Sequence, residues 1–321
     1  MAVLSQIISS THRAGRKRLV DNFFTGTPLL ERMKINDQVK TLTPGNGRKI
    51  VLPVVVNQAN GGYYDASGME TFAAADTEEV SAAEYDWRAT RRIPAIDAMS
   101  DWMNKGPAQI VPLWASKLKI AGMGINEDVT SAMYADPTTA DTSRQIVPLE
   151  QFLDDSTTYS PGGLNSADVP RWQGATTVAG AGASLTLAMI EEGYLNASEG
   201  SVQPTDIVLS KSGYSWMFRL IVANQRYTGK DNRVGFENFM FNKAAVHFDS
   251  HILITGGAFT AQRAYFLNLN HLYLVIGEGA DFAIEEKNPT NADGYAAQVK
   301  LYHALVCDAR WAQSTLDNFV A

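Results

Sequence analysis

The sequence predicts an α+β fold in which strand-like and helix-like segments follow one another in mixed order. The chain has 321 residues, 45% of them hydrophobic, so it can bury a large core in two lobes or in one elaborate domain. Alternating apolar residues, typical of strands, occur both before and after a segment whose apolar residues have helical spacing. No repeat of about 20 to 50 residues is visible. Together these observations favour α+β over a repeat architecture.

The composition argues against several classes of protein. A net charge of −7 is not that of a dedicated nucleic-acid-binding protein, which normally has a basic surplus. The single cysteine, Cys307, excludes an internal disulfide framework and fits a reducing cytoplasm. No segment reaches the roughly 18 apolar residues that span a bilayer. The first residues also lack the long apolar segment of a secretory signal, so we expect neither a membrane protein nor an exported one.

Charge is unevenly distributed along the chain. In residues 1–49, Lys and Arg outnumber Asp and Glu nine to three. Four of these basic residues form a cluster: Arg13, Arg16, Lys17 and Arg18. Residues 60–86 contain no Lys or Arg but carry Asp65, Glu70, Asp76, Glu78, Glu79, Glu84 and Asp86. These segments are either two solvated surfaces or partners that meet, within one chain or between copies, where attraction would set register and partner choice.

The acidic segment lies between two strand-like segments. "RKIVLPVVV" (48–56) is rich in β-branched residues, and Pro53 suits an edge strand. "AEYDWRATRRI" (83–93) alternates, with Tyr85, Trp87 and Ala89 on one face. The pattern predicts a long hairpin arm with a polar outer face. Because a two-stranded hairpin is marginal on its own in water, we expect this arm to lie against another surface, such as a neighbouring molecule.

A helix is predicted to follow, with Asn104 as its N-cap. Its apolar stripe recurs every three or four residues and marks a packing face: Ile110, Trp114, Leu118, Ala121, Ile125, Val129 and Met133. Pro112 weakens the start of this pattern, as do Gly122 and Gly124 further along, so we expect a late start or a kink.

The second half of the chain predicts a mixture of short elements. The small, flexible residues of 173–184 indicate a hinge or a domain crossing. "LTLAMIEEGYLNAS" (185–198) predicts a helix, and residues 206–225 predict a strand that leads into a helix. Short strands are expected within 245–255, 264–276 and 281–287. Residues 296–311 predict a long strand with one shared face: Val299, Leu301, His303, Leu305 and Cys307.

The motif His247-x-Asp249-x-His251 contains residue types that bind zinc or iron. On a strand, residues two apart share a face about 7 Å apart, and residues four apart are about 13 Å apart. Neighbouring members of the motif could share one ion, but both histidines could not unless the strand bends sharply. We therefore favour a polar strand face, with a metal-dependent hydrolase as an alternative.

Other catalytic patterns are missing from the sequence. There is no Walker A or dinucleotide-binding glycine pattern, and "SGYSWMF" (212–218) lacks the second glycine of a nucleophile elbow. Cys307 lies within an apolar pattern and is better explained as a core residue than as a nucleophile. We predict that the chain is not an enzyme and has no catalytic residues, no metal site and no cofactor.

Several segments, in order, resemble tailed-bacteriophage major capsid proteins with the Hong Kong 97-type fold. "DNFFTGTPLLERMK" (21–34) resembles the short helix after the N-terminal arm, and residues 47–96 resemble the extended loop and its return strand. Residues 103–136 resemble the long spine helix, and 159–176 the Gly-Gly and Trp-containing stretch that follows it. "NADGYAAQVKLYHALVCDARWAQSTLDNF" (291–319) resembles the last strand, so the resemblance covers nearly the whole chain.

The resemblance implies a division of the chain into regions. Residues 1–45 would form an N-terminal arm and residues 46–92 the extended loop. Residues 93–174 and 295–321 would form a discontinuous peripheral domain that holds the spine helix. Residues 175–294 would form an axial domain, which places His247, Asp249 and His251 near the centre of a capsomer.

The resemblance also implies a function and a set of partners. Copies of the chain would form hexamers and pentamers of an icosahedral shell that encloses double-stranded DNA through non-specific contacts. Assembly would take place in the cytoplasm of the host bacterium, with a portal protein and a separate scaffolding protein. The acidic and basic segments become candidates for contacts between subunits. An encapsulin-type bacterial nanocompartment, which holds cargo enzymes, is an alternative with the same fold.

Overall fold

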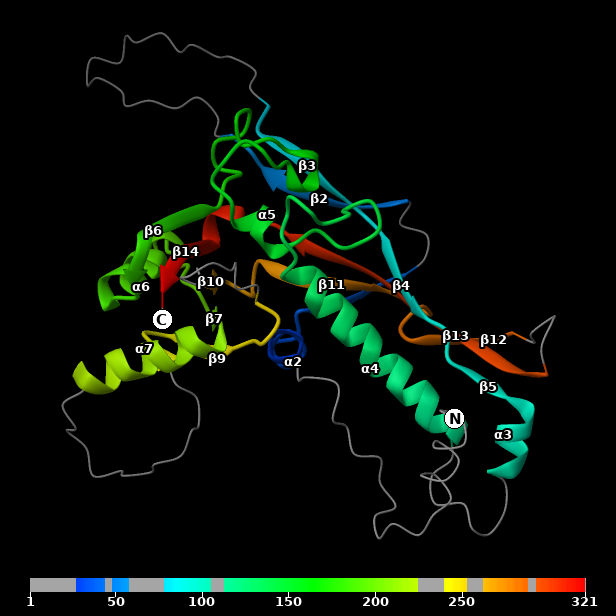
Figure 1. Ribbon diagram of the computed structural model, residues 1–321. Coiled ribbons are helices and arrows are strands. Elements are labelled where there is room, and N and C mark those ends of the chain that lie inside the picture. The colour runs from blue at the N-terminus through cyan, green and yellow to red at the C-terminus, as the bar shows by residue number, and fades with distance from the viewer. Residues whose placement is uncertain are drawn as a thin grey trace, which may run out of the picture.

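A computed structural model describes residues 27–43, 48–57, 78–104, 113–224, 240–252, 262–287 and 293–320. It has the mixed helices and sheets that the sequence predicts, arranged as two lobes with a projecting hairpin (Figure 1). Among the described residues, none of the helices combines the length and apolar character that a bilayer crossing requires. The basic cluster at residues 13–18 lies outside the described residues, as do Asp65, Glu70 and Asp76.

The first sheet is organised around one long strand, β13 (Gly294–Cys307). Along one edge β13 pairs antiparallel with β11 (Leu272–Gly277) and β12 (Ala283–Lys287), and β1 (Val39–Leu42) extends this edge by pairing parallel with β11. Two further strands also pair antiparallel with β13: β4 (Arg88–Arg92) and β5 (Ala95–Asp97).

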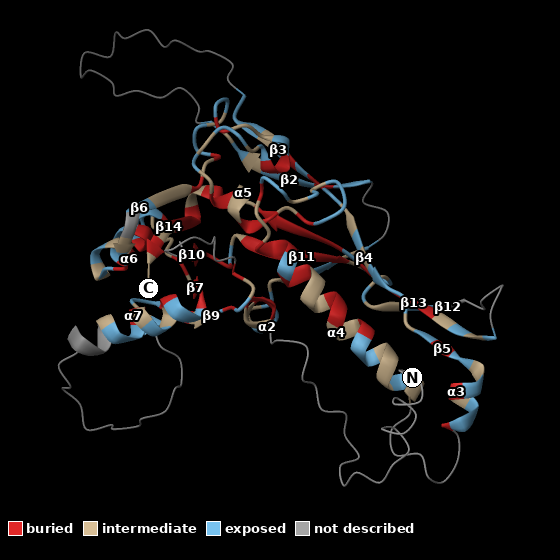
Figure 2. Ribbon diagram, in the orientation of Figure 1, coloured by how far each residue is buried: buried red, intermediate tan, exposed pale blue. Residues whose placement is uncertain are grey.

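The predicted face of β13 is confirmed. Val299, Leu301, His303, Leu305 and Cys307 are all buried. Burial raises the pKa of the Cys307 thiol to about 12, as expected for a cysteine that packs in a core and is not ionised. Figure 2 shows buried residues along this strand and its neighbours, so the strand's alternation marks the core of the first lobe.

The second sheet has the order β6-β14-β10-β7-β9-β8. Its strands are β6 (Ala175–Ser184), β14 (Ser314–Val320), β10 (Gln262–Leu267), β7 (Asp206–Leu209), β9 (Ala244–Phe248) and β8 (Met240–Phe241). Two predicted helices are confirmed and pack against this sheet: α6 (Leu187–Asn196) and α7 (Lys211–Asn224). In the segment expected to be a hinge or a domain crossing (173–184), residues 175–184 form strand β6, which pairs with β14 at the edge of the sheet.

The residue ranges that the resemblance implies for the domains stay a prediction, and strand pairing crosses their boundaries. β11 and β12 come from the range expected to be axial, yet they pair with β13 of the expected peripheral domain. β14 comes from the expected peripheral range, yet it pairs with β6 and β10. The turn at Asn268–His271 separates β10 from β11, so the segment expected as one strand contributes to both sheets.

Helix α4 (Leu113–Met133) is the longest described helix and runs beside β4 and β13 (Figure 1). Ala121, Ile125, Val129 and Met133 of the predicted stripe are buried. The predicted N-cap is wrong: Asn104 ends the short helix α3 (Ala98–Met103), and its backbone N–H donates to Ser100 O at 3.1 Å. The start of the helix, which the sequence predicts to be late, lies outside the described residues, because residues 105–112 are not described.

Near the N-terminal end of the described chain, α2 (Pro28–Ile35) buries Leu29, Leu30 and Met33. This is the short apolar helix that the sequence indicates within 21–34. Arg32 of this helix donates to Asp206 of β7 at 2.8 Å, and the Asp206 side chain is fully buried. The pair therefore connects α2 to the second sheet.

A buried arginine fixes the chain where the two lobes meet. Arg310 lies in the 3₁₀ turn η2 (Arg310–Ala312) and its side chain is fully buried. Its guanidinium donates to four backbone carbonyls, those of Gln151, Phe152, Asp154 and Trp172, at 2.8–2.9 Å. Three of these carbonyls belong to or follow the short helix α5 (Leu149–Leu153), and the carbonyls at the end of a helix have no donor within the helix itself.

Candidate assembly interface

The hairpin consists of β2 (Lys49–Val55) and β3 (Val80–Asp86), which pair antiparallel. Its inner face lies on the chain's own core, since Ile50, Ala83 and Tyr85 are buried and the Tyr85 hydroxyl donates to Cys307 O at 2.7 Å. The described part of the hairpin therefore lies against another surface, as the sequence predicts, and that surface is the chain's own core.

The turn beneath the hairpin requires glycine. The 3₁₀ turn η1 (Pro161–Gly163) places Gly162 at φ +72°, where a Cβ would lie 2.9 Å from Ala83 Cβ. The indole N–H of Trp172 donates to Pro161 O at 3.0 Å and holds this turn from the other side. The Gly-Gly and Trp-containing stretch identified in the sequence thus forms the surface on which the hairpin packs.

In its described part, the outer hairpin face is apolar along much of β2 and β3, where a polar face was expected from the sequence. Val51, Val55 and Val80 are 54%, 68% and 59% exposed, and Pro53 and Ala82 lie exposed between them. The expectation failed because the acidic residues between the strands dominated the pattern. Three large exposed β-branched side chains on one small face are typical of a surface that contacts another molecule.

The described acidic residues flank this apolar strip. Glu78 and Glu79 are exposed and lie just before β3. Glu84 accepts a hydrogen bond from Lys49 Nζ at 2.6 Å across the hairpin, so part of its charge is compensated within the chain. The role of these glutamates in contacts between subunits stays a prediction.

Two hollows border the hairpin. One of about 540 Å³ is lined by residues such as Lys49, Arg88 and Gly162. A larger one of about 850 Å³ lies between Val54 of the hairpin and Trp172 and Trp311 of the body.

A second exposed apolar surface lies at the far end of the first lobe, around α3 and β5. Trp102 is 71% exposed there, and Met99, Met103 and Ile93 are exposed beside it. This surface was not predicted from the sequence. Its signal in the sequence was an unusual one, a tryptophan and two methionines on a six-residue helix with one acidic residue.

The motif His247-x-Asp249-x-His251 does not lie on one strand. β9 ends at Phe248, and a turn follows in which His251 N donates to Asp249 Oδ1 at 3.0 Å. The strand spacing used to separate the histidines therefore does not apply. His247 lies near Asp206, with Nδ1 3.9 Å from Oδ1, whereas His251 contacts Asp249 and Glu127 of α4.

Within the described ranges, no group of three or more His, Cys, Asp or Glu side chains could hold a metal ion. The most perturbed carboxyl is Glu150, whose pKa is raised to about 7, chiefly by burial. It is ion-paired with Arg263, which also contacts Asp317. This cluster joins α5 to β10 and β14, so it acts as a structural contact between the lobes.

Neither a protein-family model nor a curated protein matches this sequence. Solved structures do. The capsid of cyanophage A-1(L) matches with a TM-score of 0.71 and 15% identity over 97% of both chains. The capsid of a native GTA particle matches with a TM-score of 0.68 and 7% identity, over 97% of this chain and 96% of that one.

An encapsulin also matches, the holo-SrpI encapsulin complex from Synechococcus elongatus PCC 7942. Its TM-score is 0.57, with 10% identity over 94% of this chain and 93% of that one. At these identities the likeness concerns the fold. The chain has the α+β fold of tailed-phage capsid proteins, the Hong Kong 97-type fold that the order of its sequence segments predicts.

Proposed function

We propose that the chain is a shell protein that assembles with copies of itself into the icosahedral head of a tailed double-stranded DNA bacteriophage. The observation that carries the proposal is the agreement of the fold with phage capsids over nearly the whole of both chains. The apolar outer hairpin face supports it, because a free monomer gains nothing from three exposed valines. The copies would form hexamers and pentamers of a closed shell.

Other parts of this proposal concern partners. A portal protein, a separate scaffolding protein and packaged DNA would contact the shell inside the host cytoplasm. The basic residues Arg13, Arg16, Lys17 and Arg18 are the candidates for contact with scaffold or DNA, and the glutamates of the hairpin are candidates for contact between subunits. Long arms suit a shell because each copy then makes many weak contacts whose effects multiply.

Electron microscopy of the expressed full chain tests the proposal. Closed shells or hexameric rings are the expected result, and a small monomer that persists at high protein concentration would contradict it. The encapsulin match supports a second candidate, a nanocompartment that holds protein cargo. Particles from the native source distinguish the two: nuclease-protected DNA supports the phage head, and a co-purifying enzyme supports the nanocompartment.

Reversing the charge of Glu78 and Glu79 to lysine should slow assembly and leave the fold intact, because both carboxylates are exposed and near the strip of valines. Light scattering during assembly measures the effect. Glu191→Lys/Glu192→Lys is the matched control, because it reverses two adjacent exposed glutamates on α6, away from the hairpin. Normal assembly of the Glu78→Lys/Glu79→Lys variant would show that these acids only face solvent.

A further inference from the structure

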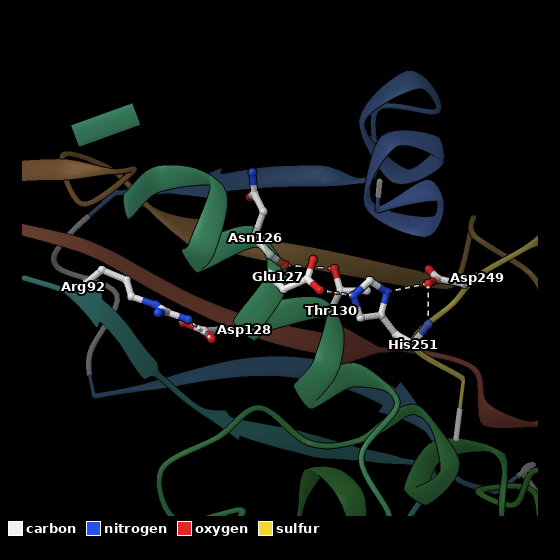
Figure 3. Close-up of polar contacts among 7 residues, drawn as sticks. All are labelled: Arg92, Asn126, Glu127, Asp128, Thr130, Asp249 and His251. Carbon is white, nitrogen blue, oxygen red and sulfur yellow. Dashed lines mark hydrogen bonds and ion pairs between the residues drawn. The ribbon is translucent and has the colours of Figure 1, made fainter. Parts of the chain in front are cut away.

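Three ionisable residues lie where helix α4 meets the turn after β9. Figure 3 shows the imidazole of His251 between the carboxylates of Asp249 and Glu127. His251 Nδ1 is 2.6 Å from Asp249 Oδ1, and His251 Nε2 is 2.8 Å from Glu127 Oε1. We call these three residues the trio. Because α4 packs on the first sheet and β9 belongs to the second, the trio joins the two lobes.

The two contacts together require a proton on both ring nitrogens of His251. An ionised carboxylate only accepts hydrogen bonds, so each ring nitrogen must carry its own N–H, and the ring is then the imidazolium cation. Asp249 is fully buried and the His251 side chain nearly so, which limits screening by water. Burial alone would lower the pKa of His251, but the hydrogen bonds that the ring donates to Asp249 and Glu127, together with the charge of these carboxylates, outweigh burial and the pKa is raised.

His247, four residues earlier, provides an internal comparison. Its nearest carboxylate, Asp206, is already ion-paired with Arg32 and also accepts a hydrogen bond from Thr205 Oγ1 at 2.8 Å. Burial is therefore the main influence, and the pKa of His247 is lowered. The charged groups around the two histidines are thus Asp206, Arg32 and Asp249 for His247, and Asp249 and Glu127 for His251. The phenol of Tyr134 also interacts with Asp249.

We propose that the trio is a proton-dependent clamp, in which the doubly protonated ring of His251 ties α4 to the second lobe and loss of one proton releases it. A neutral imidazole has a single N–H, so one of the two carboxylates would lose the hydrogen bond that the ring donates to it and would face a ring lone pair. Asp249 and Glu127 would then lack the cation between them. The inference does not depend on the chain forming a shell.

The direction of the pH dependence follows from the two shifts. The pKa of His251 is raised in the folded chain, so its stabilisation is fully present below about 6.5, the ordinary histidine value, and is lost as pH rises through the folded value. His247 has the opposite effect on stability. Its pKa is lowered in the folded chain, so the stability that depends on a neutral His247 is present above about pH 6.5 and is lost as pH falls below it. The clamp should therefore open on the alkaline side.

Exchange of the imidazole C–H for deuterium, followed by mass spectrometry, gives the pKa of each histidine in the full-length chain. We expect the pKa of His251 above the ordinary value and that of His247 below it. Backbone amides of residues 127–134 and 249–252 should be protected at about pH 6 and lose protection as pH rises through the measured pKa of His251, after correction for intrinsic exchange rates. A His251 pKa at or below the ordinary value would overturn the proposal.

Two neighbouring substitutions on α4 sharpen the test. Glu127→Gln removes one carboxylate of the trio and should lower the pKa of His251 and reduce the pH-dependent change in protection. Asp128→Asn is the matched control, because Asp128 pairs with Arg92 away from His251 (Figure 3). Equal His251 pKa values in the wild type and in Glu127→Gln would also overturn the clamp. The wild-type measurement needs no substitution, so a variant that misfolds leaves the proposal testable.

Discussion

Converting Val51, Val55 and Val80 to threonine should prevent assembly of the proposed shell while leaving the fold of the free chain unchanged. Threonine keeps the β-branched shape that a strand favours, and at these exposed positions water solvates its hydroxyl. In an interface the same hydroxyls would be buried without partners. The substitution therefore affects the contact between molecules more than the fold.

The size of the effect follows from the apolar area. Each valine is about half exposed or more, so burying it against a neighbour contributes about 1 kcal/mol, and the three together about 3 kcal/mol. A contact weakened by this amount has an association constant about a hundredfold lower. Since every subunit of a shell repeats the contact, the loss should exceed what a single pairwise interface would show.

The concentration at which shells first form, measured by light scattering and electron microscopy, reports the result. Thermal unfolding of the unassembled chain should be within a few degrees of the wild type, which separates loss of contact from loss of fold. Val178→Thr is a control at an equally exposed valine on β6, 66% exposed, away from the hairpin. Assembly of the triple variant at the wild-type concentration would exclude the outer hairpin face as a contact surface.

Local periodicity explains why some elements were predictable. The alternation over 296–307 and the helical stripe over 121–133 each depend on neighbouring residues, and burial in the fold follows both patterns. The order of such segments was also enough to predict the fold, because each long element has one apolar face and few ways to cover it. The hairpin was predictable for the same reason, as its strands alternate on their inner face.

Contacts between distant segments explain what the sequence did not predict. Glu127 and His251 are 124 residues apart, and nothing in the pattern of either segment indicates the other. The strand predicted through His251 ends at Phe248, because the Asp249 side chain accepts a hydrogen bond from the backbone N–H of His251 and so favours a turn over a continued strand. The β-branched residues around this position favour a strand, so the turn was not predicted. The outer hairpin face was misjudged because the acidic residues counted in that segment lie mostly beyond the described part of the hairpin.

Arg310 is the most extreme case, because its partners are backbone carbonyls and carry no side-chain identity. Arg310→Met should lower the free energy of unfolding by about 3–5 kcal/mol. Methionine fills a similar volume but leaves the carbonyls of Gln151, Phe152, Asp154 and Trp172 without their donor. It also removes the positive charge at the C-terminal end of α5, where the helix dipole favours a cation.

Urea unfolding of the unassembled chain measures this loss, and two variants set its scale. Arg310→Lys keeps the charge but has three N–H groups in place of the planar fork, so it should recover only part of the stability. Arg171→Met removes an arginine that is 57% exposed and contacts Glu199, and it should cost about 1 kcal/mol or less. An Arg310→Met variant as stable as Arg171→Met would mean that water or a rearranged α5 satisfies the four carbonyls, and that Arg310 does not hold the lobes together.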